Sequence, residues 1–300
     1  MTRAGYTVGV LALAAAATAA LASGRPGGPA WPGPSPEAKA QQTEPGSPDD
    51  SRIRRLLRDL WGERGTSSEP EAKAIPHDGR FVIARVRFTV GGGGGFDGGF
   101  GRGRGSREPP WAHDYPRAER NFMKLLGRIT TIKTYDGAEG GAIVDIGSKE
   151  LFRYPIAYFC EPGFWTQTDQ EAANLRAYLQ KGGFLIFDDF RGRDLDNFTA
   201  EMRRVLPDAR LVELEAANQV FHSFFEIPSL EFRQFYDRDR PVFYGIFVDN
   251  DPAKRMLAIV NYNNDISEYW EWSDTGWNPV DLTNEAYKFG VNYVVYGMTH

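Results

Sequence analysis

The sequence predicts a doubly wound α/β fold with a mostly parallel central sheet. Two short apolar runs, at 156–159 and 184–187, are typical of strands that a parallel sheet buries on both faces. Segments with a helical spacing of apolar residues separate such runs, as the crossover connections of a parallel sheet require. The chain has 300 residues, which is enough to bury a core of this kind without disulfide bonds.

The first 22 residues have the three parts of a secretory signal peptide. Arg3 supplies a positive charge, residues 8–20 are apolar, and Ala20-Leu21-Ala22 is a small-x-small cleavage site. We therefore expect cleavage near Ala22 and export to the periplasm or the extracellular space. An uncleaved N-terminal anchor is the alternative that the sequence leaves open.

Two further segments precede the predicted domain. Residues 23–50 contain seven of the 19 prolines and few apolar side chains, which predicts a disordered linker. Residues 51–64 predict a short amphipathic helix with apolar residues on one side and arginines on the other. This helix either packs on its own domain or makes a peripheral contact with a membrane surface or a protein partner.

A single α/β domain is predicted over residues 78–300. In its first strand, within 81–90, apolar side chains alternate with Arg85 and Arg87, which predicts a half-exposed strand. The Gly-rich run 91–105 follows. It lacks the residue spacing of a phosphate-binding loop, so we interpret it as a flexible loop or lid and not as a nucleotide site.

The middle of the domain alternates helices and strands. One helix is predicted to begin after Pro116. The next starts with a capping box, in which Thr168 and Glu171 satisfy each other's free backbone N–H groups, and it ends at Gly182. The apolar strand 184–187 follows it directly.

The last third of the chain has a different rhythm. A helix that ends at Pro207 leads into a strand at 211–214. Segments 242–248 and 256–262 then predict a β-hairpin, because a short turn separates them. Residues 283–296 predict a C-terminal helix.

Three motifs give this chain a resemblance to an exported bacterial family, the domain of unknown function 4159: Tyr154-Pro155-Ile156, Leu175-x-x-x-Leu179-x-x-Gly182-Gly183-Phe184-Leu185-x-x-Asp188-Asp189, and Gly290-Val291-Asn292-Tyr293-Val294-Val295-Tyr296. The resemblance covers residues 78–300. It implies a flavodoxin-like sheet of the class I glutamine amidotransferase-like type, near the trehalose-utilisation-type domains. It implies no established activity.

The resemblance also bears on the only cysteine, Cys160. In amidotransferases the nucleophilic cysteine lies on a sharp turn where a strand leads directly into a helix. By resemblance this turn follows 184–187, where Asp188-Asp189 stands instead. Cys160 ends another strand and is followed by a loop, so we interpret it as a buried, inert thiol.

Several polar residues are candidates for a ligand site. Asp188 and Asp189 follow the strand 184–187, and ligands of open α/β sheets bind beyond the carboxyl ends of the strands. Glu161 and His222 belong to the same predicted rim. The carboxylates either hold loops and helix ends or bind a ligand. No metal site and no cofactor are expected, because none of the four histidines has the spacing of a metal-binding pair.

A group of aromatic residues is the second candidate site. Tyr269, Trp270, Trp272 and Trp277 lie close together in the sequence. They either stack on the apolar face of a sugar or form a satellite core, because aromatic side chains dominate core burial.

These observations lead to three hypotheses. The first is a non-catalytic ligand-binding or assembly module with an unknown protein partner or a small-molecule ligand. The second is a hydrolase or sugar-processing enzyme using Asp188 or Asp189 with His222, and the third is a glycan binder using the aromatic group. The formal net charge of −5 argues against nucleic acid as a partner.

Overall fold

A computed structural model describes residue 70, residue 75 and the ranges 77–91, 108–234 and 239–300. These residues belong to a unit that extends from Gly65 to His300. The predicted signal peptide (1–22), linker (23–50) and amphipathic helix (51–64) lie outside the described residues. So does the Gly-rich run beyond Gly91.

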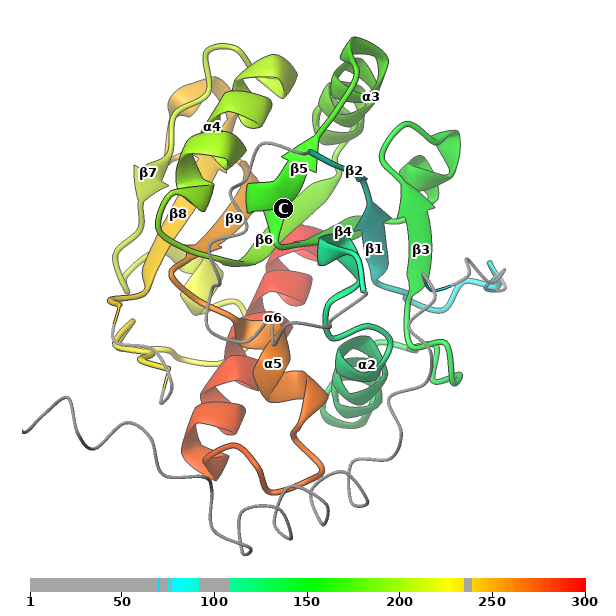
Figure 1. Cartoon of the computed structure of the whole chain (residues 1–300). Helices are drawn as coiled ribbons and strands as arrows, with labels where there is room; N and C mark the ends of the chain where they lie inside the picture. The colour runs from blue at the N-terminus through cyan, green and yellow to red at the C-terminus, as the bar shows by residue number, and fades with distance from the viewer. Residues whose placement is uncertain (1–69, 71–74, 76, 92–107, 235–238) are drawn as a thin grey trace, which may run out of the picture. The chain divides into compact units, whose positions relative to one another are not determined.

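A seven-stranded sheet forms the centre of this unit (Figure 1), with the strand order β3-β1-β4-β6-β9-β8-β7. Its strands are β1 (Ala84–Arg87), β3 (Ala142–Asp145), β4 (Ile156–Cys160), β6 (Phe184–Phe190), β7 (Val212–Glu213), β8 (Val242–Phe247) and β9 (Met256–Tyr262). β3, β1, β4, β6 and β9 are parallel neighbours. Numbered along the chain, these five strands have the order 2-1-3-4-5, which is the flavodoxin-like order.

The C-terminal hairpin is part of this sheet. β8 pairs antiparallel with β9 and with β7. The hairpin predicted at 242–248 and 256–262 is therefore confirmed, and its second strand also pairs with β6. A separate two-stranded sheet joins β2 (Thr89–Val90) to β5 (Trp165–Thr166).

Helices cover both faces of the main sheet. Figure 1 shows α3 (Asp169–Gln180) and α4 (Asp194–Val205) on one side of the sheet, and α2 (Arg117–Ile129), α5 (Ile266–Glu271) and α6 (Val280–Thr299) on the other. Side chains of β4 alternate between the two cores. Ile156, Tyr158 and Cys160 pack toward α2, α5 and α6, whereas Ala157 and Phe159 pack toward α3 and α4. This alternation follows from the two-residue period of a strand.

Local sequence signals set several helix ends. At α3, the hydroxyl of Thr168 accepts a hydrogen bond from the backbone of Glu171, whose carboxylate accepts one from the backbone of Thr168. The predicted capping box is therefore confirmed. Short 3₁₀ helices occupy some of the connections: η2 (Pro110–Ala112), η3 (Lys149–Arg153), η4 (Pro162–Phe164), η5 (Gln219–Phe221) and η6 (Val248–Asn250). Among the described helices, none is long and apolar enough to cross a membrane.

Two strands differ from their prediction. Arg85 in β1 is fully buried, so this strand is not half-exposed. β6 does not stop after Phe187 but continues through Asp188 and Asp189 to Phe190. Its register against β9 shifts between Phe187 and Phe190, as in a β-bulge. In both strands, charged side chains are buried because they make hydrogen bonds or ion pairs inside the protein. Both strands contribute to the candidate site described below.

Candidate functional site

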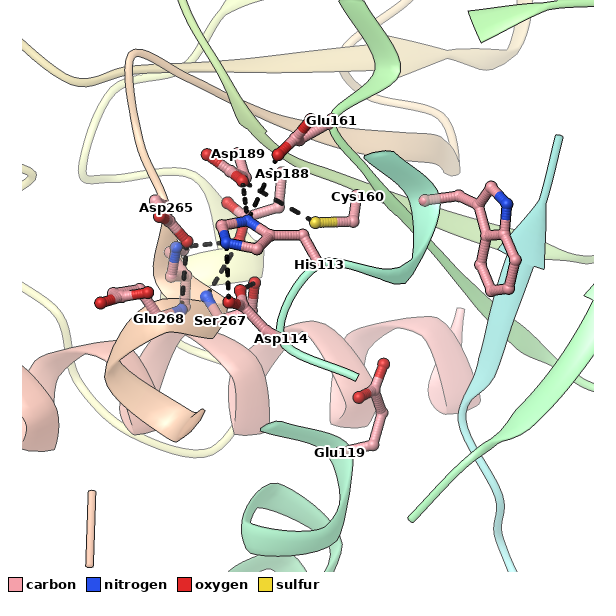
Figure 2. A network of polar contacts seen from close by, with 12 residues as sticks. His113, Asp114, Glu119, Cys160, Glu161, Asp188, Asp189, Asp265, Ser267 and Glu268 are labelled. Atoms are coloured by element: carbon pink, nitrogen blue, oxygen red, sulfur yellow. Dashed lines mark hydrogen bonds and ion pairs between the residues drawn. The ribbon is translucent and has the colours of Figure 1, made fainter. Parts of the chain in front are cut away.

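Three segments of the chain bring polar side chains together at the carboxyl edge of the parallel sheet (Figure 2). β4 ends at Cys160 and is followed by Glu161, and β6 carries Asp189 near its end. The segment that leads into α2 contributes His113 and Asp114. We call these five residues the edge cluster. Ligands of flavodoxin-like sheets bind at this edge, beside the point where the strand order reverses, which here lies between β1 and β4.

The imidazole of His113 lies at the centre of the edge cluster (Figure 2). Its Nδ1 is 2.8 Å from Oδ2 of Asp189 and 3.3 Å from Oε1 of Glu161. Its Nε2 is 3.6 Å from Oδ1 of Asp114. The carboxylate of Asp114, supported by the hydrogen bond to Asp189, raises the pKa of His113 well above its usual value against the effect of burial. The side chain is 35% exposed, so solvent reaches the cluster through this ring.

Asp114 is almost completely buried. Its Oδ2 accepts a hydrogen bond of 2.6 Å from the hydroxyl of Ser267. Its Oδ1, which faces Nε2 of His113, accepts no hydrogen bond from a described N–H or hydroxyl group. A side-chain hydrogen bond with Asp114 contributes to the raised pKa of Glu271, so this carboxyl group also reaches Asp114. Burying a carboxylate oxygen without a hydrogen-bond donor costs free energy. A ligand, a proton or a rotated His113 that binds this oxygen would recover part of that cost.

The thiol of Cys160 also belongs to the edge cluster. Its Sγ lies 3.9 Å from Oδ2 of Asp189, and the side chain is completely buried. Burial raises the pKa of the thiol well above its usual value, although Arg85 and His113 act in the opposite direction. Because the thiolate is the nucleophilic form, this environment disfavours Cys160 as a free nucleophile.

Three of the five residues in the edge cluster have a left-handed backbone. The φ angles are 65° at Asp114, 47° at Glu161 and 56° at Asp189. Such a conformation costs a non-glycine residue about 1–3 kcal/mol and is concentrated at functional sites. At Asp189 it coincides with the bulge in β6, which turns this carboxylate toward His113.

Adjacent Asp188 has a different role. Its Oδ2 accepts hydrogen bonds from the backbone N–H groups of Ile266 (2.8 Å) and Ser267 (3.1 Å) and from the hydroxyl of Tyr158 (2.5 Å). It therefore caps the first turn of α5. Burial raises the pKa of Asp188 to about 7, although these hydrogen bonds act in the opposite direction. The two carboxylates were expected either to hold loops and helix ends or to bind a ligand. Asp188 holds a helix end, whereas Asp189 belongs to the edge cluster.

A buried ion pair fixes the segment that carries His113. Arg85 donates through Nε to Oε1 of Glu119 at 2.6 Å, and through a terminal nitrogen to the carbonyl oxygens of Trp111 (3.3 Å) and His113 (2.9 Å). Neither charged side chain is more than 2% exposed. Burial opposes the charge of Arg85, but the attraction of Glu119 together with that of other nearby acidic groups outweighs it and raises the pKa of the guanidinium. This link from β1 explains how His113 reaches the sheet edge.

The surroundings of the edge cluster are strongly acidic. Asp265, Glu268 and Glu271 belong to α5 or cap it, and burial together with the neighbouring carboxylates raises the pKa of each. Arg191, 3.3 Å from Asp189, brings a further cation to the cluster by an ion pair. Two sets of three donor atoms lie within 4.8 Å of one another: His113, Cys160 and Asp189, and His113, Asp114 and Glu268. The prediction of no metal site rested on the spacing of histidines along the sequence. It missed these sets because each joins residues from distant parts of the chain.

His222 was predicted to share a rim with Glu161, Asp188 and Asp189, but its ring contacts other residues. One ring nitrogen is 2.5 Å from Glu226, and the other is 2.6 Å from the carbonyl oxygen of Ala216. Both nitrogens are thus engaged near η5, and the histidine that meets Asp189 is His113. His113 and Asp114 were absent from the sequence-based candidates. These two residues lie in the connection that follows β1. Because the connections after parallel strands begin at the carboxyl edge of the sheet, the adjacent His and Asp in this connection were the sequence feature that could have identified them.

Two members of the aromatic group, Tyr269 and Trp270, belong to the core, whereas Trp277 is 57% exposed. Trp270 is 2% exposed, stacks on Phe122 with ring centroids 4.4 Å apart, and donates its indole N–H to the carbonyl of Ala286. Tyr269 is completely buried, and the half-buried Trp272 lies under Arg117. The glycan-binding hypothesis fails for Tyr269 and Trp270, because their faces are covered by the protein itself.

Two hollows of about 460 Å³ each lie away from the edge cluster. One is between α2 and α6, with Leu125 and Tyr287 in its wall, and the other includes Phe81, Lys133 and Tyr154. Neither contains a residue of the edge cluster.

No curated protein matches this chain. The model of one protein family, the domain of unknown function 4159, matches residues 101–298, which include every residue of the edge cluster. The chain belongs to this family of domains of unknown function.

Proposed function

We propose that this protein is a ligand-binding module whose edge cluster binds a cation. The observation that carries the proposal is the buried carboxylate of Asp114, whose Oδ1 faces the cluster and accepts no hydrogen bond from a described N–H or hydroxyl group. The carboxylates of Glu161 and Asp189 lie on the opposite side of the His113 ring. Confined negative charge of this kind attracts a cation much more strongly than it would in water.

The surroundings support binding of a small ion in preference to a large organic molecule. Three donor atoms of the edge cluster, from His113, Cys160 and Asp189, are within 4.8 Å of one another, a spacing that suits a single ion. Amidotransferase chemistry has no support here, because the buried Cys160 has a raised pKa and because Asp188-Asp189, within β6, occupies the positions where the resemblance implies a nucleophile. The first 22 residues favour a role outside the cytoplasm, which cell fractionation would test.

The test is thermal unfolding of the full-length chain after treatment with a chelator, with and without added divalent cations. A cation at 100 times its dissociation constant stabilises the folded state by about 2.7 kcal/mol. For a domain of this size, that corresponds to an increase in Tm of roughly 5–10 °C. We expect such an increase for at least one of Zn²⁺, Co²⁺, Mn²⁺, Ca²⁺ and Mg²⁺.

Asp114→Asn is the informative variant. Asparagine tolerates the left-handed backbone and can still accept the hydrogen bond from Ser267, so the fold is retained while the charge is lost. We expect the cation-dependent increase in Tm to shrink in this variant. Asp208→Asn removes a charge from an exposed loop residue and should leave the increase unchanged. If no cation stabilises the wild-type chain, the proposal is wrong.

A second candidate function is hydrolysis, which the 2.8 Å contact between His113 and Asp189 favours, since acid–base partners need this separation. His113 is also the solvent-accessible member of the cluster. A panel of chromogenic esters and glycosides tests this function. Turnover that disappears in Asp189→Asn would support it, and the same turnover in wild type and variant would contradict it.

A further inference from the structure

We infer that the cation is a transition metal of the zinc type, bound by Nδ1 of His113, Sγ of Cys160 and Oδ2 of Asp189. This inference rests on the proposed cation binding and adds the identity of the ligands and the class of metal.

The three donor atoms are already close to the geometry of a metal site. Nδ1 of His113 and Sγ of Cys160 lie 2.8 Å and 3.9 Å from Oδ2 of Asp189, and all three atoms are within 4.8 Å of one another. In a tetrahedral zinc site, bonds of about 2.0–2.3 Å place the donor atoms roughly 3.3–3.7 Å apart. Adjustments on the order of 1 Å would therefore make room for the ion.

The chemistry of the donors selects the class of metal. Calcium and magnesium prefer oxygen ligands, whereas a set of one sulfur, one imidazole nitrogen and one carboxylate oxygen suits zinc and related ions. The sulfur comes from Cys160, the only cysteine of the chain. The three ligands belong to three segments at the sheet edge (Figure 2). A metal ion would therefore connect the ends of β4 and β6 to the segment before α2.

Asp114 occupies the position of a supporting residue. A histidine that binds a metal through one ring nitrogen usually donates its other N–H to a carboxylate, which fixes the tautomer and the orientation of the ring. Here Oδ1 of Asp114 lies 3.6 Å from Nε2 of His113 and accepts no hydrogen bond from a described N–H or hydroxyl group, while Ser267 holds Oδ2 at 2.6 Å. An imidazole that binds a metal through Nδ1 carries its proton on Nε2, the nitrogen that faces this oxygen of Asp114.

Two further contacts hold the ligands in place. Arg85 donates to the backbone carbonyl of His113, and Arg191 lies 3.3 Å from Oδ1 of Asp189, the oxygen that does not face His113. With three protein ligands, one position of a tetrahedral site stays open for water or substrate, as in catalytic zinc sites. Glu161, 3.3 Å from Nδ1 of His113, stands beside the three ligands.

The experiment is a titration of the metal-free, full-length chain with Co²⁺, followed by displacement with Zn²⁺. A cysteine thiolate bound to Co²⁺ gives a charge-transfer absorption band, and a tetrahedral site gives intense d–d bands. We expect both in the wild-type protein at one ion per chain, and we expect Zn²⁺ to abolish them. The charge-transfer band should be absent from Cys160→Ser.

Two variants and a control complete the test. His113→Gln should weaken Zn²⁺ binding at least about 100-fold, and Asp114→Asn should weaken it about 10–100-fold, as is typical of a residue that supports a metal ligand. His222→Gln also removes an imidazole, but one engaged by Glu226 and Ala216, and should leave binding unchanged. Should Cys160→Ser not fold, the presence or absence of the charge-transfer band in the wild-type protein decides the question.

The outcomes separate the two proposals. If no cation binds, both cation binding and the zinc-type site are wrong. If Ca²⁺ or Mg²⁺ binds and Zn²⁺ and Co²⁺ do not, or if Co²⁺ binds without a thiolate band, the zinc-type site is overturned while cation binding stands.

Discussion

Substitution of Glu119 by glutamine tests whether the buried ion pair with Arg85 stabilises the fold. The carboxylate is 2.5–2.6 Å from two nitrogens of the guanidinium, and the two side chains are 0% and 2% exposed. Glu119→Gln removes the negative charge with little change in volume. It leaves the positive charge of Arg85 uncompensated in the interior, and loss of one partner of a buried pair costs about 3–5 kcal/mol.

The expected loss is large enough to measure by thermal unfolding followed by circular dichroism. A domain of this size loses about 2–4 °C of Tm per kcal/mol, so Glu119→Gln should lower Tm by roughly 6–20 °C. The matched control is Asp145→Asn, which breaks the ion pair between Asp145 and Arg87. Arg87 lies in β1, two residues after Arg85. The pair of Arg87 and Asp145 is 31% and 55% exposed and should contribute less than about 1 kcal/mol.

The comparison between the two variants is the decisive result. If Glu119→Gln lowers Tm no more than Asp145→Asn does, Arg85 is not held in the interior by Glu119, and the explanation for the position of His113 fails.

Three other predictions concern single side chains. Cys160 is completely buried, so a thiol reagent should modify it only after unfolding, and rapid modification of the native protein would contradict its burial. Trp270→Ala removes the indole that stacks on Phe122 and should cost about 3–5 kcal/mol in urea unfolding. Trp277→Ala, at a side chain that is 57% exposed, should cost no more than about 0.5 kcal/mol, and equal losses would refute the assignment of Trp270 to the core. Thr168→Ala breaks the capping box of α3 and should lower the free energy of unfolding by about 1 kcal/mol, whereas no change would show that the cap does not stabilise the helix.

Much of the fold could be predicted because its signals are local. The capping box at Thr168 depends on residues three positions apart, and the strand at 184–187 is a continuous apolar run. The helix predicted at 283–296 lies within α6, which extends from Val280 to Thr299. The ends of such elements shift by a few residues, because packing against neighbouring elements extends them beyond the local pattern.

Part of the candidate site could be predicted for a similar reason. Asp189 and Glu161 follow apolar strands, and the carboxyl ends of parallel strands form the ligand-binding edge of the sheet. The same rule selected Asp188, which instead caps α5. The direction in which each carboxylate points depends on the bulge in β6, and the sequence carries no local signal for that bulge.

By itself, the sequence determined the alternation of strands and helices, the family and the edge of the sheet at which polar residues gather. Only the tertiary structure decided which of those residues meet. His113 and Asp189 are in contact although they are 76 positions apart. Arg85 has the spacing of an exposed residue and is nevertheless buried, because Glu119 on α2 neutralises its charge. Contacts of this kind depend on where distant segments pack, which periodicity along the chain cannot specify.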